Sequence, residues 1–136
     1  MKNFDVQSIF LQVPQELALT FIADGSLLPM WTQAFAHVNG ERALMRTPNG
    51  EVEIDLKIRA SAEHGTVDWI MTFPDQSIAT AYSRLICLSH DSCVFCFILT
   101  PPPVPLEQLE GTLQVQSKIL AEELLSLKKL IENKPQ

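Results

Sequence analysis

The sequence has no hydrophobic run long enough to cross a bilayer. Its longest uninterrupted apolar stretch is "CVFCFIL", residues 93–99. A transmembrane helix needs roughly 18–20 such residues, so this stretch predicts a buried strand instead. The first ten residues, "MKNFDVQSIF", lack an apolar segment followed by a small-residue cleavage site, so we find no secretory signal. We therefore expect a cytoplasmic protein.

Positive charge is scarce and scattered. Lysine and arginine total 10 against 16 aspartate and glutamate residues, which gives a formal net charge of −6. The one adjacent basic pair is Lys128-Lys129. Phosphate backbones and anionic lipid surfaces would be repelled by such a chain. The composition argues against nucleic acid and against an anionic membrane as partners.

Cysteine is also rare, with Cys87, Cys93 and Cys96 as the three examples. An odd number of cysteines without an export signal predicts reduced thiols. Cys93 and Cys96 have the spacing of half a zinc knuckle, but residues three apart on a strand point to opposite faces. No second Cys/His pair stands at ligand spacing. We predict that the cysteines pack in the core, and we expect neither a metal nor another cofactor.

The chain contains no internal repeat, low-complexity linker or shift in composition. A length of 136 residues suits one hydrophobic core. We therefore predict a single domain over residues 1–136.

The first part of the chain predicts a strand and two short helices. The strand covers Phe4–Val13 and ends at Pro14, a residue that can open a helix. In "PQELALTFIA" the apolar residues recur at i,i+4 spacing and form one stripe on a short helix. Gly25 fits the position just past the end of that helix. Ser26 could then cap a second short helix that runs to Trp31.

The middle of the chain changes to a period of two. In "EVEIDLKIR", residues 51–59, apolar and charged residues alternate strictly. This pattern predicts a strand with one buried face and one solvent-exposed face. "TVDWIMTF", residues 66–73, repeats the pattern after a turn at His64-Gly65. The other strands expected here are residues 41–47 before a turn at Pro48-Asn49-Gly50, residues 77–89, and residues 93–100. Adjacent strands with short turns predict an antiparallel meander.

A proline-rich segment, residues 101–105, ends the sheet. From Leu106 to Ile131 the apolar residues recur at threes and fours, which predicts one long amphipathic helix. A helix of roughly 40 Å is long enough to cover a sheet with one apolar face. The order of elements predicts an α+β helix-grip fold. In this fold a curved antiparallel sheet wraps around the long C-terminal helix, and two short helices follow the first strand.

At "VPQELALTFIADGSLLPMW" the sequence resembles the START/Bet v 1-like (SRPBCC) superfamily. Within it the chain is similar to bacterial polyketide cyclase/dehydrase and lipid-transport-like proteins. The pattern is Pro14 after the first strand, a short helix, Asp24, and Trp31 seven residues on. The C-terminal "LAEELLSLKKLIE" is similar to the closing helix of that family. The resemblance spans nearly the whole chain and concerns the fold more than the activity.

The resemblance implies a pocket between the curved sheet and the long helix, open near the short helices, with Trp31 at its edge. Such a pocket would take a small hydrophobic ligand, either lipid-like or polycyclic and polyketide-like. Aromatic and methionine side chains suit its wall, but they suit a filled core equally well. The candidate ligand-binding residues are Trp31, Phe35, Leu56, Trp69, Met71, Phe73, Tyr82 and Arg84.

Tyr82 and Arg84 depend on which face of residues 79–88 turns inward, and the sequence leaves this open because neither face is decisively apolar. If they point inward, they bring a phenol and a guanidinium to the carboxylate or carbonyl of a ligand. If they point outward, they are ordinary surface side chains.

Three functions remain open. The first is a ligand-binding protein. We favour it on three grounds: the resemblance, the apolar inward face of the predicted sheet, and the lack of a Ser-His-Asp, Cys-His or glycine-rich phosphate motif in the sequence. The second is a cyclase/dehydratase-type enzyme in which a shaped pocket orients a flexible substrate, with Tyr82, Arg84 and His37 as the residues to test. The third is an interaction module similar to chaperone-ATPase activators, which would need an exposed apolar patch. We name no catalytic residue, and whether the chain forms a homodimer stays open.

Overall fold

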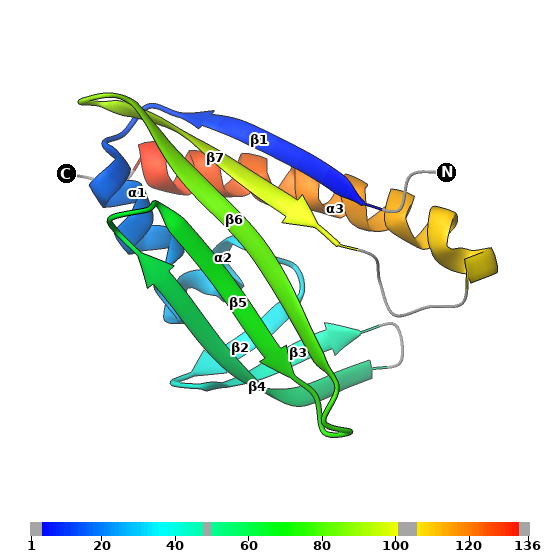
Figure 1. Cartoon of the computed structure of the whole chain (residues 1–136). Helices are drawn as coiled ribbons and strands as arrows, with labels where there is room; N and C mark the ends of the chain where they lie inside the picture. The colour runs from blue at the N-terminus through cyan, green and yellow to red at the C-terminus, as the bar shows by residue number, and fades with distance from the viewer. Residues whose placement is uncertain (1–3, 48–49, 101–105, 134–136) are drawn as a thin grey trace.

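The computed structural model describes residues 4–47, 50–100 and 106–133, apart from the side chains of residues 106–110. Within them the chain forms one seven-stranded antiparallel sheet (Figure 1). Its strands are β1 (Asp5–Leu11), β2 (Phe35–Asn39), β3 (Arg42–Thr47), β4 (Gly50–Ser61), β5 (Thr66–Thr72), β6 (Ile78–Ser89) and β7 (Ser92–Leu99). Two predicted features, the turn at Pro48-Asn49 and the proline-rich segment 101–105, lie outside the described residues.

The strands follow the order β1-β7-β6-β5-β4-β3-β2. From β2 to β7 each strand pairs with the next one in the chain, which confirms the predicted meander. Strand β1 comes from the other end of the sequence and pairs with β7, with Asp5 opposite Leu99 and Leu11 opposite Cys93. This pairing leaves β1 and β2 as the two edges of the sheet.

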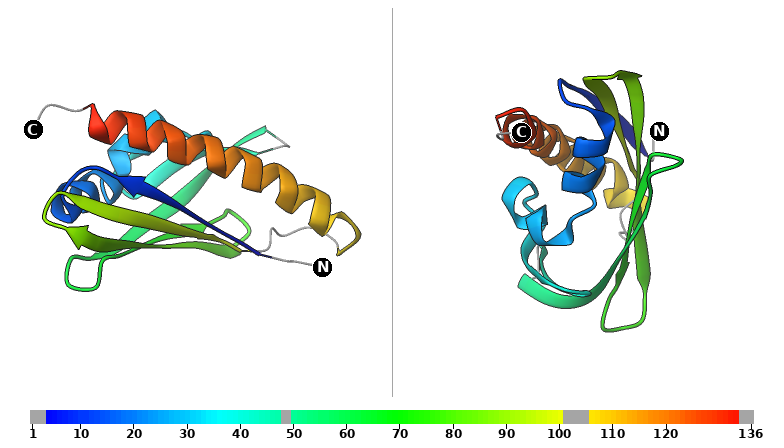
Figure 2. Two further views of the ribbon diagram at one scale, coloured as in Figure 1. Left: turned by 90° about the horizontal axis from the view of Figure 1, so that it is seen from above. Right: turned by 90° about the vertical axis from the view of Figure 1, so that its left-hand side faces the viewer.

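The helices are α1 (Gln15–Ile22), the 3-10 helix η1 (Gly25–Leu27), α2 (Leu28–Trp31) and α3 (Leu106–Glu132). All of them lie on the concave side of the sheet, which curls around them (Figure 2). We call this concave side the inner face and the opposite side the outer face. The arrangement confirms the predicted helix-grip fold. None of the helices in the described part of the chain has an apolar stretch that would reach across a bilayer.

Two details of the short helices differ from the prediction. Helix α1 is capped by Ala23 rather than ended by Gly25. The residue that caps η1 is Asp24 rather than Ser26, because the Asp24 carboxylate accepts the Ser26 N–H at 3.0 Å. Gly25 serves a packing role instead. A Cβ atom on Gly25 would lie 2.9 Å from Cδ1 of Ile58 on β4, so glycine allows η1 to approach the sheet.

Strand β2 was not predicted. Its pairing with β3 is irregular between Phe35 and His37, so the alternation of inward and outward side chains breaks at that point. Phe35 is buried and Val38 is half-buried, three residues apart. A strand with such a break does not show the period of two by which strands are recognised in a sequence.

Helix α3 covers the inner face with one apolar stripe. The buried residues of this stripe are Leu113, Leu120, Leu124, Leu127 and Ile131. Polar contacts fix the helix along β1: Nε2 of Gln7 donates to the Ser117 carbonyl at 2.8 Å, and Nζ of Lys128 donates to the Phe10 carbonyl at 2.7 Å. Burial provides the main stabilisation, while these directional bonds set the register of α3 against the sheet.

Candidate ligand-binding site

The inner face of β4 and β5 is apolar, as the alternating pattern predicts. Leu56 on β4 and Trp69 and Met71 on β5 are buried, with 2%, 3% and 8% of their surface exposed. The charged residues that alternate with the apolar residues of β4 are exposed on the opposite face. These two strands supply a wall of large side chains that faces α3.

Strand β6 carries small side chains on its inner face, which are Ala79, Ala81 and Ser83. Trp69 on β5 pairs with Ala81, and Phe97 on β7 pairs with Ser83. Because the side chains between them are small, the rings of Trp69 and Phe97 reach over β6 and stack, with centroids 5.8 Å apart and planes at 30°. The centre of the inner face is therefore aromatic.

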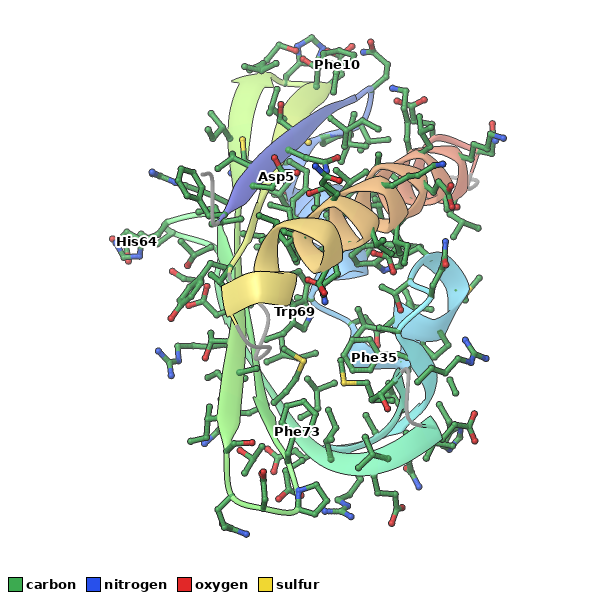
Figure 3. All side chains as sticks on the ribbon, turned by 90° about the vertical axis from the view of Figure 1, so that its right-hand side faces the viewer. Asp5, Phe10, Phe35, His64, Trp69 and Phe73 are labelled. Atoms are coloured by element: carbon green, nitrogen blue, oxygen red, sulfur yellow. The ribbon has the colours of Figure 1, made fainter. Side chains whose placement is uncertain are left out.

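Trp31 joins this aromatic group from the opposite side. Helix α2 brings its ring to 6.4 Å from Trp69 and 6.5 Å from Phe95, both edge-on. Phe95 in turn meets Phe97 edge-on at 6.4 Å. The aromatic cluster of Trp31, Trp69, Phe95 and Phe97 thus joins α2 to strands β5 and β7 of the sheet. In Figure 3 the labelled Phe35 and Phe73 also point into the interior, from different arms of the curved sheet.

The two indole N–H groups of this cluster have no hydrogen-bond partner. Nε1 of Trp31 and Nε1 of Trp69 are both buried, and no described residue accepts from either. A buried donor without an acceptor costs about 1–3 kcal/mol, and tryptophan normally finds a partner when it is buried. An oxygen acceptor within reach of either donor would remove that donor's cost.

Other inward polar groups are already paired. The buried Ser83 hydroxyl donates to the Val67 carbonyl at 2.7 Å. On β1, Asp5 and Gln7 are half-buried at inward positions, and Nε2 of Gln7 also donates to Oδ2 of Asp5 at 2.8 Å. The sequence analysis did not single out these two residues. In the sequence, Asp5 and Gln7 alternate with Phe4 and Val6. A prediction from that alternation would have turned Phe4 and Val6 toward the core and left Asp5 and Gln7 at the surface.

The structure places six of the eight predicted ligand-binding residues on the inner side of the sheet. Trp31, Phe35, Leu56, Trp69 and Met71 are buried, and Phe73 is half-buried against them. Tyr82 and Arg84 require a correction, because both are exposed on the outer face of β6. Their neighbours Ala81, Ser83 and Leu85 occupy the inward positions, so Tyr82 and Arg84 do not line the interior.

The histidine and cysteine candidates do not form a reactive group. His37 is exposed on β2, away from the cluster. The prediction that the cysteines pack in the core is confirmed for Cys93, which is fully buried on the inner face of β7, but it is wrong for Cys87, which is exposed on β6. Cys96 is half-buried at an outward position of β7. Burial is the largest cause that raises the pKa of the Cys93 thiol to about 11, which keeps it protonated and unreactive at neutral pH. The described residues bring no three metal-ligating side chains together.

A hollow of about 420 Å³ opens on the surface beside the short helices. Its lining comes from α1, η1, α2 and the end of α3, and consists of Phe21, Leu27, Met30, Lys129, Leu130 and Asn133. No strand contributes to it, so this helical groove is distinct from the sheet–helix interface. It adjoins the interior through Phe21, which is also part of the core.

Comparison with known proteins gives a fold but no sequence relative. No protein-family model and no curated protein matches the chain. Among solved structures, a START superfamily protein from Mycobacterium smegmatis is 11% identical, with a TM-score of 0.71 over 96% of this chain and 98% of that one. The chain has the START-like fold.

Aromatase/cyclase structures share this START-like fold. The di-domain ARO/CYC BexL from the BE-7585A biosynthetic pathway is 12% identical, with a TM-score of 0.75 over 98% of this chain and 48% of that one. The Zhui aromatase/cyclase from Streptomyces sp. R1128 is 7% identical, with a TM-score of 0.61 over 94% of this chain and 90% of that one. Identities this low establish the fold alone.

In this START-like fold, Glu123 of α3 holds the segment that follows Trp31. Its carboxylate accepts the Gln33 N–H at 2.6 Å and also accepts the N–H of Ala34. Burial raises the pKa of Glu123, and these two hydrogen bonds offset the rise only in part. Glu123 is therefore a positioning residue that ties the strand carrying Phe35 to the long helix.

Proposed function

We propose that the protein binds a small hydrophobic molecule, lipid-like or polycyclic, between the curved sheet and α3. The observation that carries this proposal is the pair of unpartnered indole N–H groups of Trp31 and Trp69 in an apolar interior. A bound oxygen acceptor removes the cost of both orphan donors. The apolar walls of β4 and β5 supply contact area for the rest of the ligand.

The same residues define the polar end of the ligand. Two neutral N–H donors suit a carbonyl, ether or hydroxyl oxygen. A carboxylate is disfavoured because no lysine or arginine faces the aromatic cluster in the described part of the chain, and an unpaired buried charge is costly. We therefore assign a neutral, oxygen-bearing ligand to the site.

We place the route to the interior at the helical groove. Its mostly apolar lining and its opening to solvent suit the entry of a hydrophobic molecule, and Met30, which is 57% exposed at its rim, directly precedes Trp31. The Met30→Trp change would narrow this opening without touching the indole pair. We expect slower ligand association with a smaller change in equilibrium affinity, as a stopped-flow and titration comparison would measure.

A cyclase-type reaction is the second candidate, because the aromatase/cyclase structures named above share the fold. It would require an acid–base group on the inner face. Asp5 is half-buried there and pairs with Leu99 on β7, while Trp69 pairs with Ala81 on β6. Leu99 and Ala81 each stand one residue beyond the Ile98–Tyr82 pair of β7 and β6, so Asp5 and Trp69 lie at the same level of the sheet. Three strand spacings, about 14 Å, separate the two backbones, so a polycyclic substrate could contact both. Loss of turnover in Asp5→Asn with unchanged ligand affinity would favour the enzyme.

The test begins with native mass spectrometry of gently purified protein, followed by identification of any released molecule. Because Trp31 and Trp69 are the two tryptophans of the chain, intrinsic fluorescence then reports binding directly. A hydrophobic ketone and the hydrocarbon of matching shape are titrated against the wild type and the Trp31→Phe and Trp69→Phe variants. We expect each variant to bind the ketone about five- to ten-fold more weakly and the hydrocarbon almost equally well.

Phe97→Leu serves as the matched control, because Phe97 packs in the same cluster but offers no hydrogen-bond donor. This variant should weaken binding of the ketone and the hydrocarbon by similar factors. If neither compound changes the fluorescence and no mass adduct is found, the interior is a filled core and the proposal fails. If the ketone and the hydrocarbon respond equally in the tryptophan variants, the assigned role of the indoles fails.

A further inference from the structure

The outer face of β1, β7 and β6 gathers most of the exposed apolar side chains. Among the described residues, eleven large hydrophobic side chains are exposed. Eight of them lie at outward positions of β6, β7 and β1 or directly before β1: Phe4, Val6, Phe10, Ile78, Tyr82, Ile86, Leu88 and Ile98. Scattered single residues would need no explanation, but a concentration on one face does.

The strand register makes this surface continuous. One cross-strand row joins Val6, Ile98 and Tyr82. The next joins Ser8, Cys96 and Arg84, and a third joins Phe10, Val94 and Ile86. Neighbouring side chains within such rows are about 5 Å apart. We call these nine residues the outer apolar face.

No described helix packs on this surface. Lys128 of α3 reaches its β1 edge, where Nζ of Lys128 lies 5.3 Å from the centroid of the Phe10 ring. The helices pack on the inner face, and the outer side of β1, β7 and β6 is bare in both views of Figure 2. The first half of β1 is inverted relative to an ordinary amphipathic strand, because Asp5 and Gln7 turn inward and Val6 outward, whereas Ile9 and Leu11 keep the usual inward apolar positions. Phe10 turns outward as well. An outward apolar strand is costly in water, so this pattern indicates a partner on that side.

Together with Phe4, Ile78 and Leu88 at its margins, the outer apolar face approaches the area that a dimer needs. The eight exposed side chains have 40–65% of their surface accessible. At roughly 70–110 Å² each they present on the order of 600–700 Å², near the upper limit for a monomer and close to the ~800 Å² per partner of a stable interface. The face also carries no carboxylate, although the chain has 16 acidic residues.

We propose that the outer apolar face is the interface of a homodimer. A pair of opposite charges lies at the β5 margin of this face. Arg84 pairs with Thr66 and Tyr82 pairs with Asp68, so Arg84 of the face and Asp68 beside it are diagonal neighbours on β6 and β5. A two-fold axis through this part of the sheet places each Arg84 opposite the Asp68 of the other copy. The interface is independent of the proposed ligand site, which uses the inner face.

A second copy suits this surface better than a lipid membrane does. Arg84 is the single basic residue of the outer apolar face, and the chain carries a net charge of −6. Adsorption to anionic lipid relies on clustered lysine and arginine, which this face does not have. An isologous dimer needs only apolar area and one charge pair repeated twice.

The test is sedimentation velocity over a concentration series of the wild type and single variants. We expect a dimer for the wild type. Val6→Lys and Ile98→Lys should each raise the dimer dissociation constant about ten-fold or more. Val115→Lys is the matched control, since Val115 on α3 is 60% exposed against 52% for Val6 but lies off the face. It should leave the dissociation constant unchanged, and circular dichroism confirms that each variant is folded.

The charge pair gives a second, independent measurement. Arg84→Asp and Asp68→Arg should each weaken the dimer, and the double variant should regain most of the loss. Cys96 lies in the middle row, so maleimide labelling of Cys96 in the unmutated protein should slow as protein concentration rises through the dimer range.

Three results would overturn the homodimer. The first is a monomer at every concentration, and the second is a dimer that is insensitive to folded Val6→Lys and Ile98→Lys. The third is a monomeric protein that co-sediments with phosphatidylcholine vesicles, together with loss of this co-sedimentation in Val6→Lys and Ile98→Lys. That result would show that the outer apolar face binds lipid.

Discussion

The indole rings of Trp31 and Trp69 lie 6.4 Å apart, centroid to centroid, and neither N–H donates a hydrogen bond within the described structure. The two residues come from α2 and β5, elements separated by three strands in the chain. The tie between Glu123 and the segment after α2 holds the chain next to Trp31, and the small side chains of β6 allow Trp69 to stack on Phe97. A pair of orphan donors assembled in this way is the chemical centre of the interior.

The first prediction concerns the stability of the ligand-free protein. Trp69→Phe loses some packing area but also removes one unpaired buried donor, whose cost is about 1–3 kcal/mol. We therefore expect the free energy of unfolding in urea to stay within about 1 kcal/mol of the wild type. Phe97→Leu, which removes no donor, should cost about 1–2 kcal/mol. An equal loss in both variants would show that the Trp69 N–H has an acceptor in solution.

The second prediction concerns the turn between β4 and β5. Gly65 has φ of +70°, and a Cβ atom there would collide with the Leu85 carbonyl oxygen. The Gly65 carbonyl also accepts the Leu85 N–H at 2.6 Å, so the turn cannot move away without losing this bond. We expect Gly65→Ala to cost about 3 kcal/mol or more in thermal or urea unfolding.

Gly40 provides the control for Gly65. It has a similar φ of +62°, but no atom lies within 4 Å of its would-be Cβ. Gly40→Ala should therefore lower the free energy of unfolding by about 1–2 kcal/mol, the cost of holding an alanine in the left-handed backbone conformation. The extra loss of unfolding free energy in Gly65→Ala over Gly40→Ala measures the cost of the contact between the added methyl group and β6. Equal losses would contradict that packing.

Much of the fold follows from changes of period in the sequence. Strict alternation in residues 51–59 and 66–73 predicts β4 and β5, and the helical spacing from Leu106 to Ile131 predicts α3 almost to its observed end. Strand β2 was missed because its irregular pairing at Phe35 breaks the alternation. The turn between β4 and β5 was predicted from His64-Gly65, and the structure places it there.

The site was less predictable because it depends on contacts between distant segments. In β6 neither face is decisively apolar, so only the register that sets Ala81 beside Trp69 decides that Tyr82 points outward. In β1, Asp5 and Gln7 turn inward, and Gln7 finds an acceptor on α3, the carbonyl of Ser117. Both facts depend on pairing partners that no local pattern reveals.

The third prediction concerns pH and the end of α3. The Glu132 carboxylate accepts from Nζ of Lys128 at 2.6 Å and from the Gln12 N–H at 2.8 Å. Burial acts to raise the pKa of Glu132, but these hydrogen bonds and the charge of Lys128 outweigh it and lower the pKa below its usual value. The ionised form therefore stabilises the fold above the unfolded-state pKa, and this contribution is lost as the pH falls through the folded-state pKa.

Glu132→Gln should accordingly lower the free energy of unfolding by about 1 kcal/mol at pH 7. The difference from the wild type should shrink as the pH falls below about 4. Urea titrations from pH 7 to pH 3 measure this difference. A gap between the two proteins that is constant across the range would show that the hydrogen bonds, and not the charge, are responsible.

The last prediction concerns Glu123, whose ionisation changes the stability of the fold with pH in the opposite direction to that of Glu132. Burial raises its pKa in the folded state, so the folded protein binds the proton more tightly than the unfolded chain does. The wild type should lose stability as the pH rises from the unfolded-state value, near 4.5, through the folded-state pKa, and it should not change further above it. Glu123→Gln has no titrating group at this position, so urea titrations between pH 4 and pH 7 should show a flatter profile. Parallel profiles for the two proteins would mean that solvent reaches the Glu123 carboxylate and that the tie between α3 and the segment after Trp31 is open in solution.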